Sequence, residues 1–134
     1  MNGRRGFSLI EVVIVLAIIG ISLSLAGPRI GAGLGRIELN QAAQTVRTYI
    51  KLARLQAQRS DREQYLVLDR KRRSVALVGP DMRVAREEAL PGSVEFILQP
   101  EAQAAALHVA PSGILRGAPI RLRGRRGEIE VSIQ

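Results

Sequence analysis

The feature that most constrains this chain is an apolar run of nineteen residues near its beginning, Phe7 to Leu25, which contains one charged residue, Glu11. In helical form such a run reaches about 28 Å at ~1.5 Å per residue, close to the ~30 Å hydrocarbon core of a bilayer. Arg4 and Arg5 precede the run, and flanking basic residues favour the cytoplasmic side. The sequence therefore predicts a single-pass helix with its N-terminus in the cytoplasm and the C-terminal body across the membrane.

An ordinary secretory signal peptide is the alternative interpretation of this run. Such signals have a shorter apolar core, followed by a small-x-small cleavage site. Here the run is longer, it contains Glu11, and Ala26-Gly27-Pro28 is a poor cleavage site. The pattern favours a retained membrane segment.

The composition narrows the chemistry that the chain can perform. No cysteine is present, which excludes disulfides, thiol catalysis and cysteine metal sites. His108 is the only histidine, and one histidine cannot supply a zinc ligand set, so we interpret it as structural. No catalytic or phosphate-loop motif occurs. We expect no enzyme activity, no metal and no cofactor.

The strongly basic charge, +8 at pH 7, does not by itself choose between a nucleic acid, a membrane surface and a solvated protein face. Aromatic residues make up 3% of the chain and tryptophan is absent, so stacking platforms for single-stranded nucleic acid are not expected.

The body of the chain begins with an amphipathic helix, predicted over 37–59. Its apolar positions recur at a spacing of three to four residues. Arg47, Lys51, Arg54 and Arg59 lie mostly on the opposite face, which we interpret as solvated. The apolar stripe, expected to pack on a sheet, consists of Leu39, Ala42, Ala43, Val46, Ile50, Ala53 and Ala57.

Beyond residue 64 the apolar period changes to two, or to short apolar runs, which predicts a half-solvated antiparallel sheet. A long N-terminal helix followed by about seven short strands is an α+β arrangement. The strands are expected at 65–68, 74–78, 82–85, 94–98, 106–109, 120–123 and 128–133.

The segment Arg5-Gly6-Phe7-Ser8-Leu9-Ile10-Glu11 resembles the processing site of type IV pilins and type II secretion pseudopilins. The resemblance implies that 1–6 is a leader, that a prepilin peptidase cleaves between Gly6 and Phe7, and that Phe7 is N-methylated. It places Glu11 at the fifth mature position, where it pairs with the N-terminal amine of a neighbouring subunit. Gly20 and Pro28 fall where pilins often have helix-loosening residues.

Two weaker motifs in the body resemble GspH-like minor pseudopilins. They are Ala53-Arg54-Leu55-Gln56-Ala57-Gln58 before a strand, and Leu107 to Gly113 followed by Gly117. The resemblance implies a type IV pilin-like fold and a minor pseudopilin of the type II secretion system, near the tip of the pseudopilus that drives export of folded proteins. Its implied partners are other minor and major pseudopilins, the prepilin peptidase and the inner-membrane assembly platform.

These expectations divide the chain into four parts. The leader covers 1–6, the transmembrane and filament-core helix covers 7–27, a flexible connector covers 28–36, and the periplasmic pseudopilin body covers 37–134.

A FimT-like minor pilin of a type IV pilus, active in pilus assembly or DNA uptake, is the alternative function. The candidate phosphate contacts are Arg121, Arg123, Arg125 and Arg126, around the turn between Gly124 and Gly127. A solvated turn on a basic surface explains the same residues and is the more usual case, so nucleic acid is not an expected partner. A third alternative, an enzyme tethered by the helix, lacks any catalytic constellation.

Overall fold

The structure is a computed structural model that describes residues 6–99 and 102–133, with the backbone alone at 25–32. The expected leader residues 1–5, together with Pro100, Glu101 and Gln134, therefore lie outside the described residues. The chain forms two compact units, Met1–Leu34 and Gly35–Gln134.

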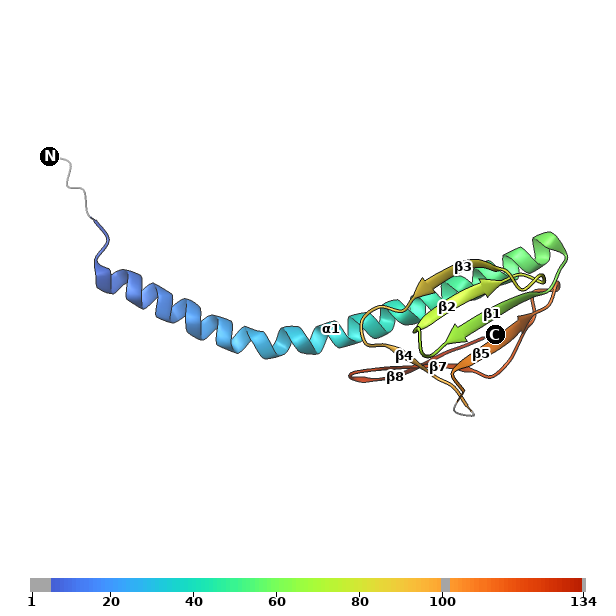
Figure 1. Cartoon of the computed structure of the whole chain (residues 1–134). Coiled ribbons are helices and arrows are strands. Elements are labelled where there is room, and N and C mark those ends of the chain that lie inside the picture. Colours follow the sequence, from blue (N-terminus) through green and yellow to red (C-terminus); the bar gives the residue numbers. More distant parts are fainter. Residues whose placement is uncertain (1–5, 100–101, 134) are drawn as a thin grey trace. The chain divides into compact units, whose positions relative to one another are not determined.

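A single long helix, α1 (Leu9–Ser60), supplies nearly all of the described first unit and the start of the second (Figure 1). The sequence predicted a connector at 28–36 between two helices, and the structure instead continues the helix through this range. Pro28 removes one backbone hydrogen bond from the helix. Each neighbouring helical residue adds one such bond, and glycine can adopt helical dihedral angles, so the helix continues through the segment. This corrects the expected interruption, whereas the flexibility of the segment stays a prediction.

Five strands of the second unit form an antiparallel sheet in the order β3-β2-β1-β5-β6 (Figure 1). Leu66 on β1 stands opposite Leu77 on β2 and Leu107 on β5, so three buried leucines share one face. The strands are β1 (Gln64–Asp69), β2 (Ser74–Val78), β3 (Val84–Ala89), β5 (Ala104–Val109) and β6 (Leu115–Arg116).

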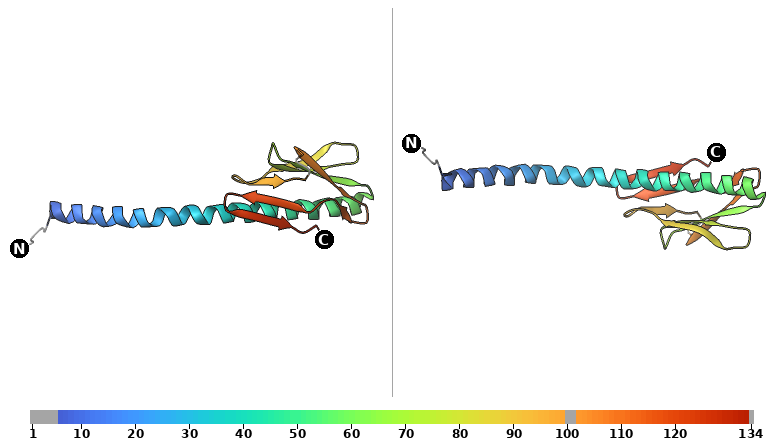
Figure 2. Two further views of the ribbon diagram at one scale, coloured as in Figure 1. Left: turned by 90° about the horizontal axis from the view of Figure 1, so that it is seen from below. Right: turned by 90° about the horizontal axis from the view of Figure 1, so that it is seen from above.

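The remaining strands form a three-stranded antiparallel sheet in the order β4-β7-β8. They are β4 (Glu95–Ile97), β7 (Ile120–Gly124) and β8 (Gly127–Val131). In both views of Figure 2, β7 and β8 run beside the second-unit part of α1. All seven predicted strand regions contain strands, although β3 begins two residues later than predicted and β6 was not predicted.

The core of the second unit joins α1 to both sheets. All seven apolar positions predicted for the helix stripe are buried, and each is at most 8% exposed. They share one cluster with Leu66 and Leu107 from the first sheet and Phe96 and Leu122 from the second. The predicted α+β architecture, a long N-terminal helix packed on an antiparallel sheet body, is confirmed.

Candidate functional site

The candidate processing site lies just before α1. Gly6 and Phe7 are outside the helix, and the Phe7 side chain is 83% exposed. A Cβ at Gly6 would meet no atom within 4 Å, so the backbone on this side of the Gly6–Phe7 bond is open. The helix starts two residues later, where the Ser8 carbonyl accepts a hydrogen bond from the Glu11 amide at 3.0 Å. An exposed, non-helical peptide bond next to a glycine is the kind of substrate that a peptidase can bind in extended form.

Glu11 lies in the first turn of α1 and is exposed. The positive end of the helix dipole favours a carboxylate there by ~0.3–1 kcal/mol. Among the ion pairs found between described residues, none includes Glu11. The pairing of Glu11 with the N-terminal amine of a neighbouring subunit stays a prediction.

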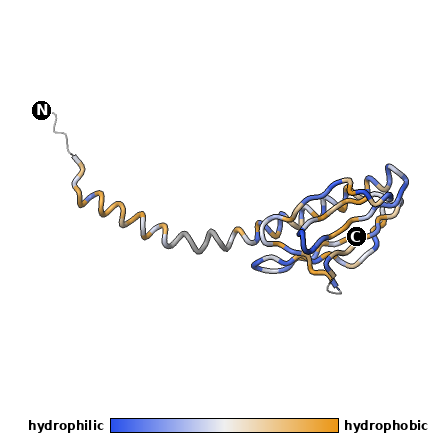
Figure 3. The backbone as a smooth tube through the Cα atoms, viewed as in Figure 1, coloured by the Kyte–Doolittle hydropathy of each residue, from blue (hydrophilic) through white to orange (hydrophobic). Residues whose placement is uncertain are grey.

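The described part of α1 in the first unit exposes apolar side chains on every face. Exposed fractions range from 46% at Val12 to 84% at Leu9, and the hydropathy colouring of Figure 3 shows the apolar character along this segment. Gly20 lies within it, with no neighbouring atom near the position of a Cβ. Where side chains are described, α1 does not offer a window that is both long and apolar enough to cross a membrane.

Two of the four candidate nucleic-acid arginines are ion-paired across the β7–β8 hairpin. Arg121 Nε lies 3.5 Å from Glu130 Oε2, and Arg123 Nε lies 2.9 Å from Glu128 Oε1. Arg125 and Arg126 occupy the turn itself and are exposed. Among the ion pairs between described residues, those of the predicted cluster lie on the strands, and none includes Arg125 or Arg126 at the turn.

His108 lies on β5, where its Nε2 is 3.2 Å from Glu63 Oε2 and its ring centroid is 5.5 Å from that of Tyr65. These contacts connect β5 to β1 and to the end of α1, consistent with a structural histidine. Sequence reasoning did not find Glu63 as the partner, because the two residues are 45 positions apart.

A buried tyrosine of α1 was also missed by the sequence interpretation. Tyr49 is 3% exposed and lies close enough to the Glu88 carboxylate on β3 to feel its charge. Burial raises the pKa of Tyr49 above its ordinary value, and the negative charge of Glu88 raises it further. The contact attaches the edge strand β3 to the helix.

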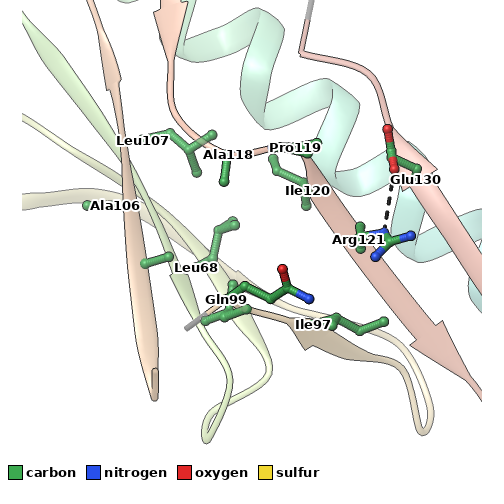
Figure 4. Close-up of a pocket in the computed structure, with 12 residues that line it drawn as sticks. Leu68, Ile97, Gln99, Ala106, Leu107, Ala118, Pro119, Ile120, Arg121 and Glu130 are labelled. Atoms are coloured by element: carbon green, nitrogen blue, oxygen red, sulfur yellow. Dashed lines mark ion pairs between the residues drawn. The ribbon is translucent and has the colours of Figure 1, made fainter. Parts of the chain in front are cut away.

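A cleft of about 270 Å³ opens between the two sheets (Figure 4). Its lining is mainly aliphatic, including Leu68, Leu107 and Ile120, and the Arg121–Glu130 ion pair lies at one side. Among the described lining residues the charged groups are Arg121 and Glu130, which pair with each other, so the cleft offers mainly apolar contact.

Residues 1–27 match a family model described as "Prokaryotic N-terminal methylation motif". The motif includes Gly6, Phe7, Glu11 and Gly20. The chain is type IV pilin-like. A curated relative, "Pilin-like protein PilA1" of Thermus thermophilus, is 43% identical over 54 residues, which are 40% of this chain and 33% of the relative. No solved structure matches.

The chain thus spans about a third of the curated relative that it matches. The methylation motif of this pilin-like chain ends before Pro28, so it does not cover the second unit with its sheets and basic turns.

Proposed function

We propose that this chain is a non-catalytic filament subunit that resides in the inner membrane before assembly, with its N-terminus in the cytoplasm and its body in the periplasm. The observation that carries the proposal is an apolar helical segment with exposed side chains within a methylation motif. Burying a Val, Leu or Ile side chain contributes about 1.5–3 kcal/mol relative to leaving it in water. A bilayer, and then a bundle of neighbouring helices, provides that cover.

The proposed processing follows from the same segment. A prepilin peptidase cleaves between Gly6 and Phe7 on the cytoplasmic side, and the Phe7 amine is methylated. The free amine remains cationic at neutral pH and pairs with Glu11 of an adjacent subunit. Transfer of subunits from the bilayer to the filament requires an assembly platform and other pilin-like subunits as partners.

At the finer level, we propose a minor pseudopilin of a type II secretion system. The support is the helix end Ala53 to Gln58 that leads into β1, and the segment Leu107 to Gly113 at the end of β5, both of which resemble GspH-like proteins. The alternative is a FimT-like minor pilin, favoured by the name of the Thermus relative and by the two exposed turn arginines, Arg125 and Arg126.

The processing step provides a direct test. We expect the mature chain purified from membranes to begin at N-methylated Phe7 by mass spectrometry. Gly6→Val, which adds a branched side chain beside the scissile bond, should leave the chain uncleaved, whereas Gly3→Val in the same leader should be cleaved normally. A parent chain that retains Met1 in active cells would overturn the proposal.

A deletion strain distinguishes the pseudopilin from the minor pilin. A secretion defect with intact pili supports the pseudopilin assignment. A loss of pili or of DNA uptake with intact secretion supports the pilin assignment. Each defect should be restored by the parent chain and not by Gly6→Val.

A further inference from the structure

Two basic turns of the second unit lie at the same end of the body. The β1–β2 turn contains Arg70, Lys71, Arg72 and Arg73, and the β7–β8 turn contains Arg125 and Arg126. All six side chains are exposed. We call these six residues the basic collar.

Both basic turns lie near the beginning of the part of α1 that belongs to the second unit. A Cβ at Gly35 would lie 3.5 Å from Arg126 Cγ, so the Arg126 stem covers α1 at this position. Arg73 Nη1 donates to the Gly92 carbonyl at 2.8 Å, and Gly92 lies against Glu38 on the next turn of α1. Gly92 has a φ of 60°, which favours glycine, and the Glu38 carboxylate lies against it. One residue of each turn therefore lies near the beginning of the second-unit helix, Arg126 directly and Arg73 through Gly92.

The charge at this end is not balanced locally. The carboxylates nearby are Glu38 on α1, Asp69 before the first turn, Glu95 at the start of β4, and Glu87 and Glu88 on β3, where Glu87 accepts the Ser74 hydroxyl at 2.7 Å. Arg36 on α1 adds a further cation, so the cations remain in excess. Among the ion pairs of the described residues, none includes a collar residue.

The opposite end of the body provides an internal contrast. There, the end of α1 with the segment that follows it, the β2–β3 turn and β6 carry four arginines and three carboxylates, and Arg83 pairs with Asp81 at 3.5 Å. These residues are Arg59, Arg62, Arg83, Arg116, Asp61, Glu63 and Asp81. The larger excess of positive charge belongs to the end at which the apolar segment is covalently attached.

We propose that the basic collar docks on anionic phospholipid headgroups of the bilayer, holding the body against the membrane surface before the subunit enters the filament. This inference rests on the proposed membrane insertion. Residues 26–34 separate the apolar run from Gly35, so nine residues tether the collar to the segment that is proposed to insert.

Such docking is reversible, because it depends on electrostatic attraction between the collar and the headgroups. Each basic residue near an anionic surface favours binding by about fivefold, and salt screens the attraction. A membrane that lacks anionic lipid should leave the body undocked while the apolar segment stays inserted, because insertion depends on burial of apolar side chains and not on the collar.

The absence of cysteine allows the full chain to be probed with single labels. Gln103→Cys places a fluorophore beside the collar, since the Gln103 carbonyl accepts the Arg70 amide at 2.8 Å. Ser112→Cys places one at the opposite end, where Gly113 contacts Gln58 near the end of α1. Ser22→Cys reports insertion of the apolar segment. Each labelled chain is reconstituted in vesicles of phosphatidylcholine, with or without phosphatidylglycerol, that contain a headgroup quencher.

We expect quenching at position 103 and not at 112, dependent on phosphatidylglycerol and lost at high salt. Replacing Arg70, Lys71, Arg125 and Arg126 by Gln should weaken docking about fivefold per charge. The matched control replaces Arg47, Lys51, Arg59 and Arg62 by Gln, which removes the same charge from other exposed positions, and should leave docking unchanged. Thermal melts of both variants should match the parent.

Each remaining outcome has a defined meaning. If position 22 reacts with a water-soluble thiol reagent, the proposed membrane insertion fails. If position 22 is protected but position 103 is not quenched in anionic vesicles, the collar proposal alone is overturned. Equal quenching with phosphatidylcholine alone, or collar-dependent binding of duplex DNA with no docking on lipid, also overturns it.

Discussion

At the scale of single residues, Glu11 separates insertion from assembly. Glu11→Leu makes the apolar run continuous, so insertion should persist, and cleavage should persist because it depends on Gly6. Incorporation into the filament should fail, because the amine of an adjacent subunit would enter the apolar core without its partner. Breaking a buried ion pair in this way costs about 3–5 kcal/mol. Crosslinking to partner subunits in membranes measures the effect.

Glu11→Gln supplies the matched comparison for this experiment. It keeps a hydrogen-bond acceptor of the same size but removes the charge, so we expect intermediate crosslinking. If Glu11→Leu crosslinks and functions like the parent, the carboxylate only extends to the membrane interface and the pairing mechanism is wrong.

Tyr49 makes the stability of the folded state depend on pH. Because its pKa is raised in the folded state, its contribution to stability is complete below the ordinary tyrosine pKa of about 10 and is lost as the pH rises through the folded-state value. Tyr49→Phe removes the ionisable hydroxyl and should therefore flatten the decline in stability at alkaline pH. Urea unfolding across pH compares the two chains. Tyr65→Phe, at a half-buried position, is the control, and parallel curves for Tyr49→Phe and the parent would contradict the assignment.

At the scale of elements, the buried stripe of α1 is the seam that joins the helix to both sheets. Val46 is 0% exposed at its centre, and the next residue, Arg47, is exposed. Val46→Asp should destabilise the body by several kcal/mol, because a carboxylate in this seam has no partner. Arg47→Asp should change stability by less than about 1 kcal/mol. A thermal melt of Val46→Asp that matches the parent would show that the helix does not form part of the core.

The elements with a clear local period were predictable from the sequence. The helix stripe and the β1–β2 hairpin depend on regular spacing of apolar residues, and both are confirmed. The continuity of α1 through 28–36 was not predictable, because Pro28 and several glycines lower the local helix preference. The helical segments on both sides overcome this local effect. The strand β6 is only two residues long, too short to show an alternation of apolar and polar residues. It is defined by its pairing with β5.

The same distinction applies to the candidate site. Gly6, Phe7 and Glu11 lie in one short segment, so their pattern is visible in the sequence and the methylation motif includes them. The contacts of Tyr49 with Glu88 and of His108 with Glu63, and the meeting of the two basic turns at Gly35 and Glu38, connect residues that are distant in sequence. Such contacts follow from strand order and register, which local periodicity does not specify.

At the scale of the whole molecule, the two units have different physical requirements. The described part of the first exposes apolar side chains, whereas the second has its own core of helix and two sheets. Division between Leu34 and Gly35 therefore separates a part with exposed apolar side chains from a part that buries its own.

This division predicts that the fragment 35–134 folds alone. It retains the whole helix stripe, and we expect a soluble chain with one cooperative thermal transition. The fragment 47–134 lacks the first part of the stripe, which consists of Leu39, Ala42, Ala43 and Val46. Losing the burial of Leu39 and Val46 alone removes about 3–6 kcal/mol, comparable with the total stability of a small domain, and leaves apolar strand faces uncovered. Circular dichroism should therefore show a cooperative melt for 35–134 and none for 47–134. Equal melting temperatures for the two fragments would mean that the sheets fold without this part of α1, and that the body begins later in the chain than Gly35.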